Sequence, residues 1–265
     1  MSDKQKALLQ ERVNGALLVT LNRPEALNAI SPQMIEEFEQ LLDRVEEDPD
    51  VASLILTGTG RAFCAGADLK IAHDVPQEDR ERAGNALITR ATKMMARVES
   101  LPKPVIAAVN GIATAGGMEL LLCCDLVIAA ESARLGDGHA NFGLLPGAGA
   151  SARLPRRLGL SRAKYLLFTG DLLPAENFVA AGLVNAVVPD AELRGAALEL
   201  AAKIATKSPL GLRRMKELVN ESMGLTLEQA LRLELAVNAS YVHSYDRAEG
   251  LAAFNEKRRP KFRGE

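Results

Sequence analysis

The pattern of apolar and polar positions divides the chain into short buried strands and amphipathic helices. Residues 16–21 form an apolar run typical of a buried strand. Ser31 and Pro32 then provide an N-cap and a first-turn proline for a helix, whose apolar positions recur at helical spacing as far as Val45. The alternation continues, and we predict further strands at 51–56, 104–109 and 126–129 and further helices at 89–98 and 117–124.

This alternation predicts an α/β fold with buried sheets. The run 105–109 is apolar at every position, as in parallel strands that are covered on both faces. Beyond residue 190 no strand is predicted, and helical spacing is found at 193–204, 210–219, 227–236 and 246–256. We therefore predict two regions, a core at 1–190 that carries the candidate site and a helical C-terminal region at 191–265.

The composition is that of an ordinary globular protein, with 48% hydrophobic and 25% charged residues. The net charge of −2 gives no reason to expect nucleic acid or an anionic membrane surface as a partner. No run approaches the roughly 20 apolar residues of a membrane span. Residues 1–13 lack the apolar stretch of a secretory signal. We therefore expect a cytoplasmic protein that does not bind membranes.

The cysteines further limit the possible chemistry. Their number is odd and two of them, Cys123 and Cys124, are adjacent, which argues against disulfides and for a reducing compartment. We interpret the third, Cys64, as a small buried hydrophobic residue, because a nucleophilic thiol needs a nearby base. No spacing of Cys and His fits a metal site, and we predict none.

Two glycine-containing segments, 61–68 and 110–119, carry the candidate chemistry. In such small-residue turns, backbone N–H groups can point at one anionic oxygen, and the second segment ends in a carboxylic acid. Two converging N–H donors and one acid are the minimum equipment for stabilising an enolate and moving a proton next to it. Gly116 and Gly117 start a predicted helix, where the helix dipole adds to the donors and a missing Cβ allows close approach. Taken alone, these glycines also fit a helix-starting turn packed under a strand.

Glu119 follows in the first turn of the same predicted helix. One interpretation is an acid that stabilises a helix N-terminus through the dipole. However, its neighbours Met118 and Leu120 are apolar, so the carboxylate should be at least partly buried. Burial would raise its pKa, which suits a proton carrier near neutral pH.

Seven segments of the chain, in order and at compatible spacing, resemble the crotonase (enoyl-CoA hydratase/isomerase) superfamily. They lie at 21–28, 54–69, 103–111, 146–149, 167–170, 181–185 and 249–258. The resemblance implies a spiral of repeated ββα units, followed by helices that pack subunits into a homotrimer or a hexamer made from two trimers. It also implies a reversible addition of water to a 2-enoyl-CoA through an oxyanion-stabilised enolate. The partner is then an acyl-CoA thioester, and no cofactor is needed beyond the coenzyme A that the substrate carries.

The resemblance also assigns residues to the site. The two oxyanion donors fall on the backbone N–H groups of Ala67 and Gly116, and Glu119 matches a catalytic glutamate. Lys257 matches a lysine that reaches a CoA phosphate, often from a neighbouring subunit. The channel for the CoA moiety would be lined by residues beside the first donor, namely Ala65, Gly66 and Asp68.

One departure from the family pattern affects the chemistry. Hydratases of this family carry a second catalytic glutamate in a Pro-Glu pair, but this chain has Gly138 and His139 there. His139 could replace that acid, since imidazole titrates near neutral pH. It could instead bind an acyl carboxylate or orient a water, or be a structural histidine. Asp137 is a reserve candidate for the same pocket. Isomerisation, thioester hydrolysis, decarboxylation and a non-catalytic CoA-binding role remain alternatives to hydration.

Other segments bear on the substrate. Residues 71–82 include six charged residues and are predicted to be a surface loop or helix, either a solvated connector or a lid over the acyl pocket. His73 and His243 are interpreted as surface residues. Thr114-Ala115 and Ala150-Ser-Ala152 differ from the residues that the family usually has at these positions. These differences should change the shape of the acyl pocket.

Overall fold

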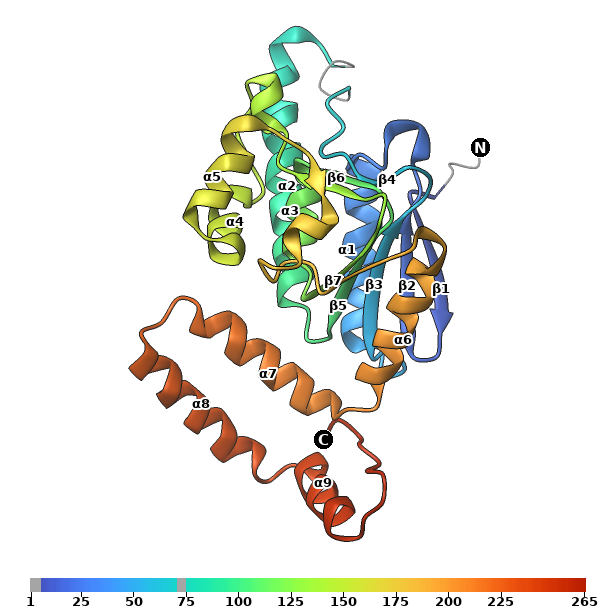
Figure 1. Cartoon of the computed structure of the whole chain (residues 1–265), viewed down its shortest axis with the longest axis vertical. Helices are drawn as coiled ribbons and strands as arrows, with labels where there is room; N and C mark the ends of the chain where they lie inside the picture. Colours follow the sequence, from blue (N-terminus) through green and yellow to red (C-terminus); the bar gives the residue numbers. More distant parts are fainter. Residues whose placement is uncertain (1–5, 71–74) are drawn as a thin grey trace.

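Two β-sheets form the body of the molecule, and helices connect their strands (Figure 1). The computed structural model describes residues 6–70 and 75–265. The larger sheet has the strand order β1 (Leu8–Val13), β2 (Ala16–Leu21), β3 (Ser53–Gly58), β5 (Val105–Val109), β7 (Leu126–Ala130) and β10 (Ala186–Val188). Its first pair is antiparallel and the others are parallel. The smaller sheet has the order β4 (Ala62–Cys64), β6 (Ile112–Thr114), β8 (Arg134–Gly136) and β9 (Leu173–Pro174), with only the last pair antiparallel.

The chain repeats one ββα unit. β3 and β4 lead into α2 (Arg80–Ser100), β5 and β6 into α3 (Gly116–Leu122), and β7 and β8 into α4 (Ala150–Leu158). In each unit the first strand belongs to the larger sheet and the second to the smaller one. The predicted α/β fold with repeated ββα units is therefore confirmed. Because β4, β6 and β8 are parallel neighbours, the segments that follow them all begin at the carboxyl ends of these strands, on one side of the smaller sheet.

The strongest local sequence signals gave accurate elements. β2 spans the predicted residues, and α1 (Pro32–Glu47) begins after Ser31, whose Oγ accepts a hydrogen bond from the N–H of Met34 at 3.1 Å. One face of α1 is fully buried, including Phe38 and Leu41. This cap and this face are the two features that the spacing predicted.

Other elements differ from the prediction. α2 begins nine residues earlier than expected, at Arg80, because its first turns face solvent and carry no apolar stripe. The predicted loop or helix at 71–82 therefore ends inside this helix, while residues 71–74 and His73 lie outside the described residues. β1 was missed because four of its six residues are exposed at the sheet edge. β4, β6 and β8 have three residues each, too few for a periodicity to register.

The C-terminal third is helical in the described chain, as predicted. α6 (Leu193–Ala205) packs on the larger sheet, against β2, β3, β5 and β7. Beyond it, α7 (Pro209–Ser222), α8 (Leu227–Tyr241) and α9 (Tyr245–Asn255) form an arm that stands away from the body (Figure 1). The division at residues 190 and 191 stays a prediction, since α6 follows it in sequence but lies on the core.

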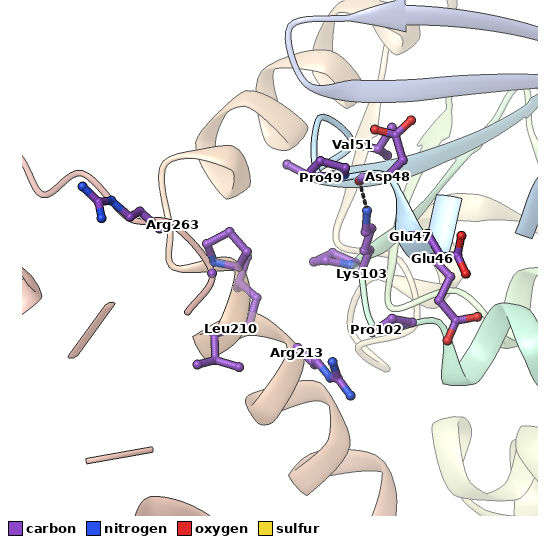
Figure 2. A pocket seen from close by; sticks show the side chains of 15 residues that line it. Glu46, Glu47, Asp48, Pro49, Val51, Pro102, Lys103, Leu210, Arg213 and Arg263 are labelled. Carbon is purple, nitrogen blue, oxygen red and sulfur yellow. Dashed lines mark hydrogen bonds between the residues drawn. The ribbon is translucent and has the colours of Figure 1, made fainter. Parts of the chain in front are cut away.

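An open cleft lies between the start of the arm and the body (Figure 2). On the body side, Lys103 donates a hydrogen bond to the carbonyl oxygen of Asp48. Leu210 and Arg213 of α7 line the opposite side, with Arg263 of the C-terminal tail. Farther along α7, Lys216 pairs with Asp125 at 2.7 Å and so ties the arm to the body. No helix in the described part of the chain is long and apolar enough to cross a membrane.

Candidate active site

Glu119 is held inside the protein by backbone donors. It lies on α3, and only 2% of its surface is exposed. Its Oε1 accepts hydrogen bonds from the N–H of Ala148 at 2.7 Å and from that of Ala150 at 3.1 Å. Among the described residues no donor reaches Oε2, so this oxygen has no hydrogen-bond partner. The predicted burial of Glu119 is confirmed and is nearly complete.

The geometry of the first glycine segment directs the N–H of Ala67 away from its neighbouring chain. Ile30 donates to the carbonyl of Gly66 at 2.7 Å and accepts from the N–H of Asp68 at 3.0 Å. Because backbone groups alternate in an extended segment, the N–H of Ala67 between them faces the other side. It donates no hydrogen bond within the described part of the chain.

The second donor lies next to the first. Gly116 is the first residue of α3, so its N–H has no acceptor within the helix. A Cβ added to Gly116 would lie 3.3 Å from the nitrogen of Ala67, which shows how closely the two segments approach. The positive end of the α3 dipole adds to this pair of donors. The two N–H groups can therefore stabilise one developing negative charge.

His139 lies opposite, in a short 3₁₀ helix, η3 (His139–Phe142). Its Nδ1 is 2.9 Å from Oδ1 of Asp137, a residue with no exposed surface. Burial alone would lower the pKa of His139, but the hydrogen bond and charge of Asp137, together with the charge of Glu119, raise it above its ordinary value. With Nδ1 bound to Asp137, Nε2 is the ring nitrogen available to the cavity.

One cavity brings the predicted groups together. Its lining includes Ala67, Gly116, Glu119 and His139, and the remaining lining is mainly apolar, with Ile30, Leu87, Ile88, Met95 and Leu144. A second cavity shares Ala67 and His139 and extends past Ala65, Thr114 and Phe142. The site can therefore enclose a largely apolar group beside the N–H groups of Ala67 and Gly116.

Other predicted site residues take different positions. Asp68 lines the first cavity, but its carboxylate pairs with Arg23 at 2.7 Å and is not free to bind a ligand. Lys257 is exposed beyond α9, on the arm, and lines neither cavity. Burial raises the pKa of the Cys64 thiol to about 12, which confirms its interpretation as an inert buried residue. His243 is exposed, as expected.

The hydrogen bonds that hold Glu119 and His139 in place could not be predicted from the sequence. Asp137 was a reserve candidate for the pocket, but it lies behind His139 and orients the ring. The N–H groups that bind Glu119 belong to Ala148, inside the motif at 146–149, and to Ala150, just after it, and the glycines of this motif were the available signal. The described residues contain no cluster of His, Cys, Asp and Glu that could hold a metal ion.

The turn before α3 stores backbone strain at Ala115, which has φ of +50° and ψ of −123°. This region suits glycine, and it costs other residues about 1–3 kcal/mol. Replacing Ala115 by glycine should release this strain, against about 0.4–1 kcal/mol of added unfolded-state entropy. We expect the free energy of unfolding to rise by about 1 kcal/mol in urea denaturation. A lower value would show that the strain at Ala115 is smaller than the entropy that glycine adds to the unfolded state.

Comparison with known proteins identifies similar sequences over almost the whole chain. A family model described as enoyl-CoA hydratase/isomerase matches residues 11–265. A short-chain-enoyl-CoA hydratase from Clostridium acetobutylicum is 35% identical over 253 residues, which cover 95% of each protein. A crotonyl-CoA hydratase from Syntrophomonas wolfei is 36% identical over 256 residues, covering 96% of this chain and 97% of the relative.

Solved structures agree with these sequence relatives. The crystal structure of an enoyl-CoA hydratase from Bacillus anthracis superposes with a TM-score of 0.92 at 39% identity. The superposition covers 98% of this chain and 100% of the other. A structure of an enoyl-CoA hydratase from Mycobacterium smegmatis gives a TM-score of 0.90 at 35% identity, with 97% of this chain and 99% of the other covered.

Proposed function

The chain belongs to the enoyl-CoA hydratase/isomerase family, and we propose that it is an enoyl-CoA hydratase, which adds water reversibly to the double bond of a 2-enoyl-CoA thioester. One observation carries the proposal: the buried carboxylate of Glu119 and the unused N–H groups of Ala67 and Gly116 line the same cavity. Relatives named as short-chain-enoyl-CoA and crotonyl-CoA hydratases support it.

The reaction would begin at the thioester carbonyl, whose oxygen accepts hydrogen bonds from Ala67 and Gly116. Oε2 of Glu119 takes a proton from water, and the water oxygen bonds to C3 of the enoyl group. The electron pair of the double bond then moves toward the carbonyl oxygen, where the two N–H groups stabilise the enolate. Protonated His139 donates to C2 through Nε2, which completes the 3-hydroxyacyl-CoA. Proton exchange with solvent returns both groups to their starting states.

The coenzyme A moiety would extend from the carbonyl along Ala65, Gly66 and Asp68. We propose a homotrimer, or a hexamer made from two trimers, in which Lys257 from the arm of a neighbouring subunit contacts a CoA phosphate. The exposed apolar residues of the arm, including Leu227, Leu235 and Phe254, support burial against another subunit. Sedimentation velocity would measure the assembly.

Replacing Lys257 by alanine should raise KM without lowering kcat, because the lysine would contact a CoA phosphate and not the reacting atoms.

We propose no cofactor beyond the coenzyme A of the substrate, because the reaction needs only a base, an acid and oxyanion donors. A cytoplasmic location is supported by the three buried cysteines, all of which are free thiols.

The alkaline limb of the pH–rate profile should report His139. Asp137 and Glu119 raise the pKa of His139, so the ring stays protonated to higher pH than an ordinary histidine. As the acid in hydration it would lose activity as pH rises through this pKa. Asp137→Asn removes a charge that raises the pKa, so the limb should move to lower pH when kcat is measured from pH 5 to 9. An unmoved limb in this variant would exclude His139 as the titrating group.

The function itself is tested by the absorbance of crotonyl-CoA, which falls as the conjugated enoyl-thioester is hydrated. Purified protein should consume it and release a 3-hydroxybutyryl-CoA that chromatography identifies. Free thiol would indicate hydrolysis, and a shifted double bond would indicate isomerisation. Absence of turnover across a panel of enoyl-CoA chain lengths, with CoA still bound, would support a non-catalytic binding role.

A further inference from the structure

Arg153 of α4 donates hydrogen bonds to Glu99 and to the backbone of Ala148, next to the residues that line the cavity. Its Nε and Nη2 donate to the two carboxylate oxygens of Glu99 at 2.9 and 2.7 Å, a bidentate pairing. Its Nη1 donates to the carbonyl oxygen of Ala148 at 2.8 Å. Only 18% of the Arg153 side chain is exposed, whereas its partner Glu99 is 40% exposed, so the guanidinium is largely buried and the carboxylate reaches solvent. Arg153 lines neither of the two cavities beside Glu119.

Ala148 connects Arg153 to Glu119. Its carbonyl binds Arg153, while its N–H donates to Oε1 of Glu119 at 2.7 Å. The next residue, Gly149, has φ of +117°, and a Cβ there would lie 1.9 Å from Nη1 of Arg153. The guanidinium therefore packs directly on the backbone of the loop at 147–150. Hydrogen bonds to Glu99 raise the pKa of Arg153, and the charge of Glu119 contributes to the same shift.

Other contacts also hold the loop, since the carbonyl of Gly149 accepts hydrogen bonds from the N–H groups of Ala152 at 3.1 Å and Arg153 at 2.8 Å. Thr92 of α2 donates to the carbonyl of Gly147 at 3.0 Å. Glu99 also belongs to α2, near its C-terminal end. Arg153 thus joins α4 directly to α2 and also binds the loop at Ala148. The two N–H groups that bind Glu119 belong to Ala148 and to Ala150, the residue at which the loop enters α4.

We propose that Arg153, held by Glu99, is a positioning residue that sets the orientation of the Glu119 carboxylate through the loop at 147–150. The inference rests on the proposed role of Glu119 as the base. Without the guanidinium, the Ala148 carbonyl loses its partner, the loop shifts and Oε2 no longer faces the water. Misplacement by about 1 Å can cost on the order of a hundredfold in rate. The oxyanion donors and most of the apolar lining lie on other segments, although Gly147 and Ala148 of the loop also line the cavity. The loss should therefore fall mainly on kcat rather than on substrate binding.

The test compares Arg153→Ala with Arg156→Ala, a matched change in the same helix. Arg156 is exposed and, within residues 6–70 and 75–265, donates only to the backbone carbonyl of Ala152. We expect Arg153→Ala to lower kcat on crotonyl-CoA by about 10- to 100-fold with KM within about threefold, and Arg156→Ala to leave both unchanged. Arg153→Lys should recover part of kcat, because one ammonium can reach one of the partners but cannot form the fork. Glu99→Gln, which keeps the shape and acceptor of Glu99, should fall between wild type and Arg153→Ala.

A crystal structure of Arg153→Ala gives a readout that does not depend on activity. We expect the hydrogen bond from the N–H of Ala148 to Glu119 to be lost. An unmoved loop would overturn the inference, and so would a change confined to KM or an equal loss of kcat in Arg156→Ala. A wild-type protein that does not hydrate crotonyl-CoA would instead count against the proposed function, and the crystal structure would still decide the role of Arg153. If Arg153→Ala does not fold, Arg153→Lys and Glu99→Gln decide it in the same assays.

Discussion

Replacing Glu119 by glutamine is expected to lower kcat for the hydration of crotonyl-CoA by about 10²- to 10⁴-fold, the usual contribution of a general base. Glutamine keeps the shape of the side chain, and its carbonyl oxygen can accept the hydrogen bonds from Ala148 and Ala150 that Oε1 accepts now. Its amide would take the place of Oε2, where it cannot accept a proton from water. The loss should therefore fall on the chemical step and leave the cavity intact.

The control for this variant is binding. The dissociation constant of a 3-hydroxyacyl-CoA product, measured by calorimetry, should stay within a few-fold of the wild-type value because the oxyanion donors belong to the backbone. A kcat within tenfold of wild type would remove Glu119 from the role of base. Attention would then move to His139 as the group that activates water.

Replacing Gly117 by alanine should produce the largest loss of stability. The added Cβ would lie 1.9 Å from the carbonyl oxygen of Cys64, at the end of β4. Both partners are fixed by backbone, one in a strand and one in α3, so no flexible side chain can move aside. Overpacking of this kind costs about 1–3 kcal/mol and occasionally more. We expect a loss of about 3 kcal/mol in the free energy of unfolding, measured by urea denaturation, and a loss of hydratase activity because Gly116 moves with it.

Gly195→Ala provides the matched control. Gly195 lies in α6, and a Cβ there meets no atom within 4 Å. The same substitution should raise the stability by about 0.8–1 kcal/mol, the difference between the two residues in a helix. A Gly117→Ala protein as stable as wild type would mean that α3 can shift away from β4, in which case the oxyanion pair should be lost without unfolding.

The sequence predicts best those elements whose caps and apolar spacing lie within one continuous segment. α1 was predicted because Ser31, Pro32 and the apolar spacing all lie within one segment. β4 was not predicted as a strand, since its three residues are defined by pairing with β6, some fifty positions later. The first turns of α2 were missed because a solvent-exposed helix start has no apolar side to register.

The same distinction applies to the site. The proximity of Glu119 to Gly116 could be predicted because both lie in one turn of one helix. The position of His139 opposite Glu119 came from the family resemblance, and the structure places both in the lining of one cavity. The hydrogen bonds from Ala148 and Ala150 to Glu119 join residues about thirty positions apart, and no local pattern reports such a contact. The role of Lys257 remains a prediction because it involves a second subunit.

In the proposed mechanism, backbone N–H groups stabilise the enolate and side chains transfer the protons, which has an evolutionary consequence. The proposed donors to the enolate oxygen are peptide groups of Ala67 and Gly116, whereas His139 is a side chain on a short turn after β8. A mutation can replace such a side chain without moving the peptide groups. A new proton-transfer residue can therefore appear at this position while the two N–H donors are kept. His139→Glu would test this directly, since it restores the acid pair of the hydratases in one step. A lineage that diversifies at this turn can change which carbon receives a proton while the recognition of the thioester stays constant.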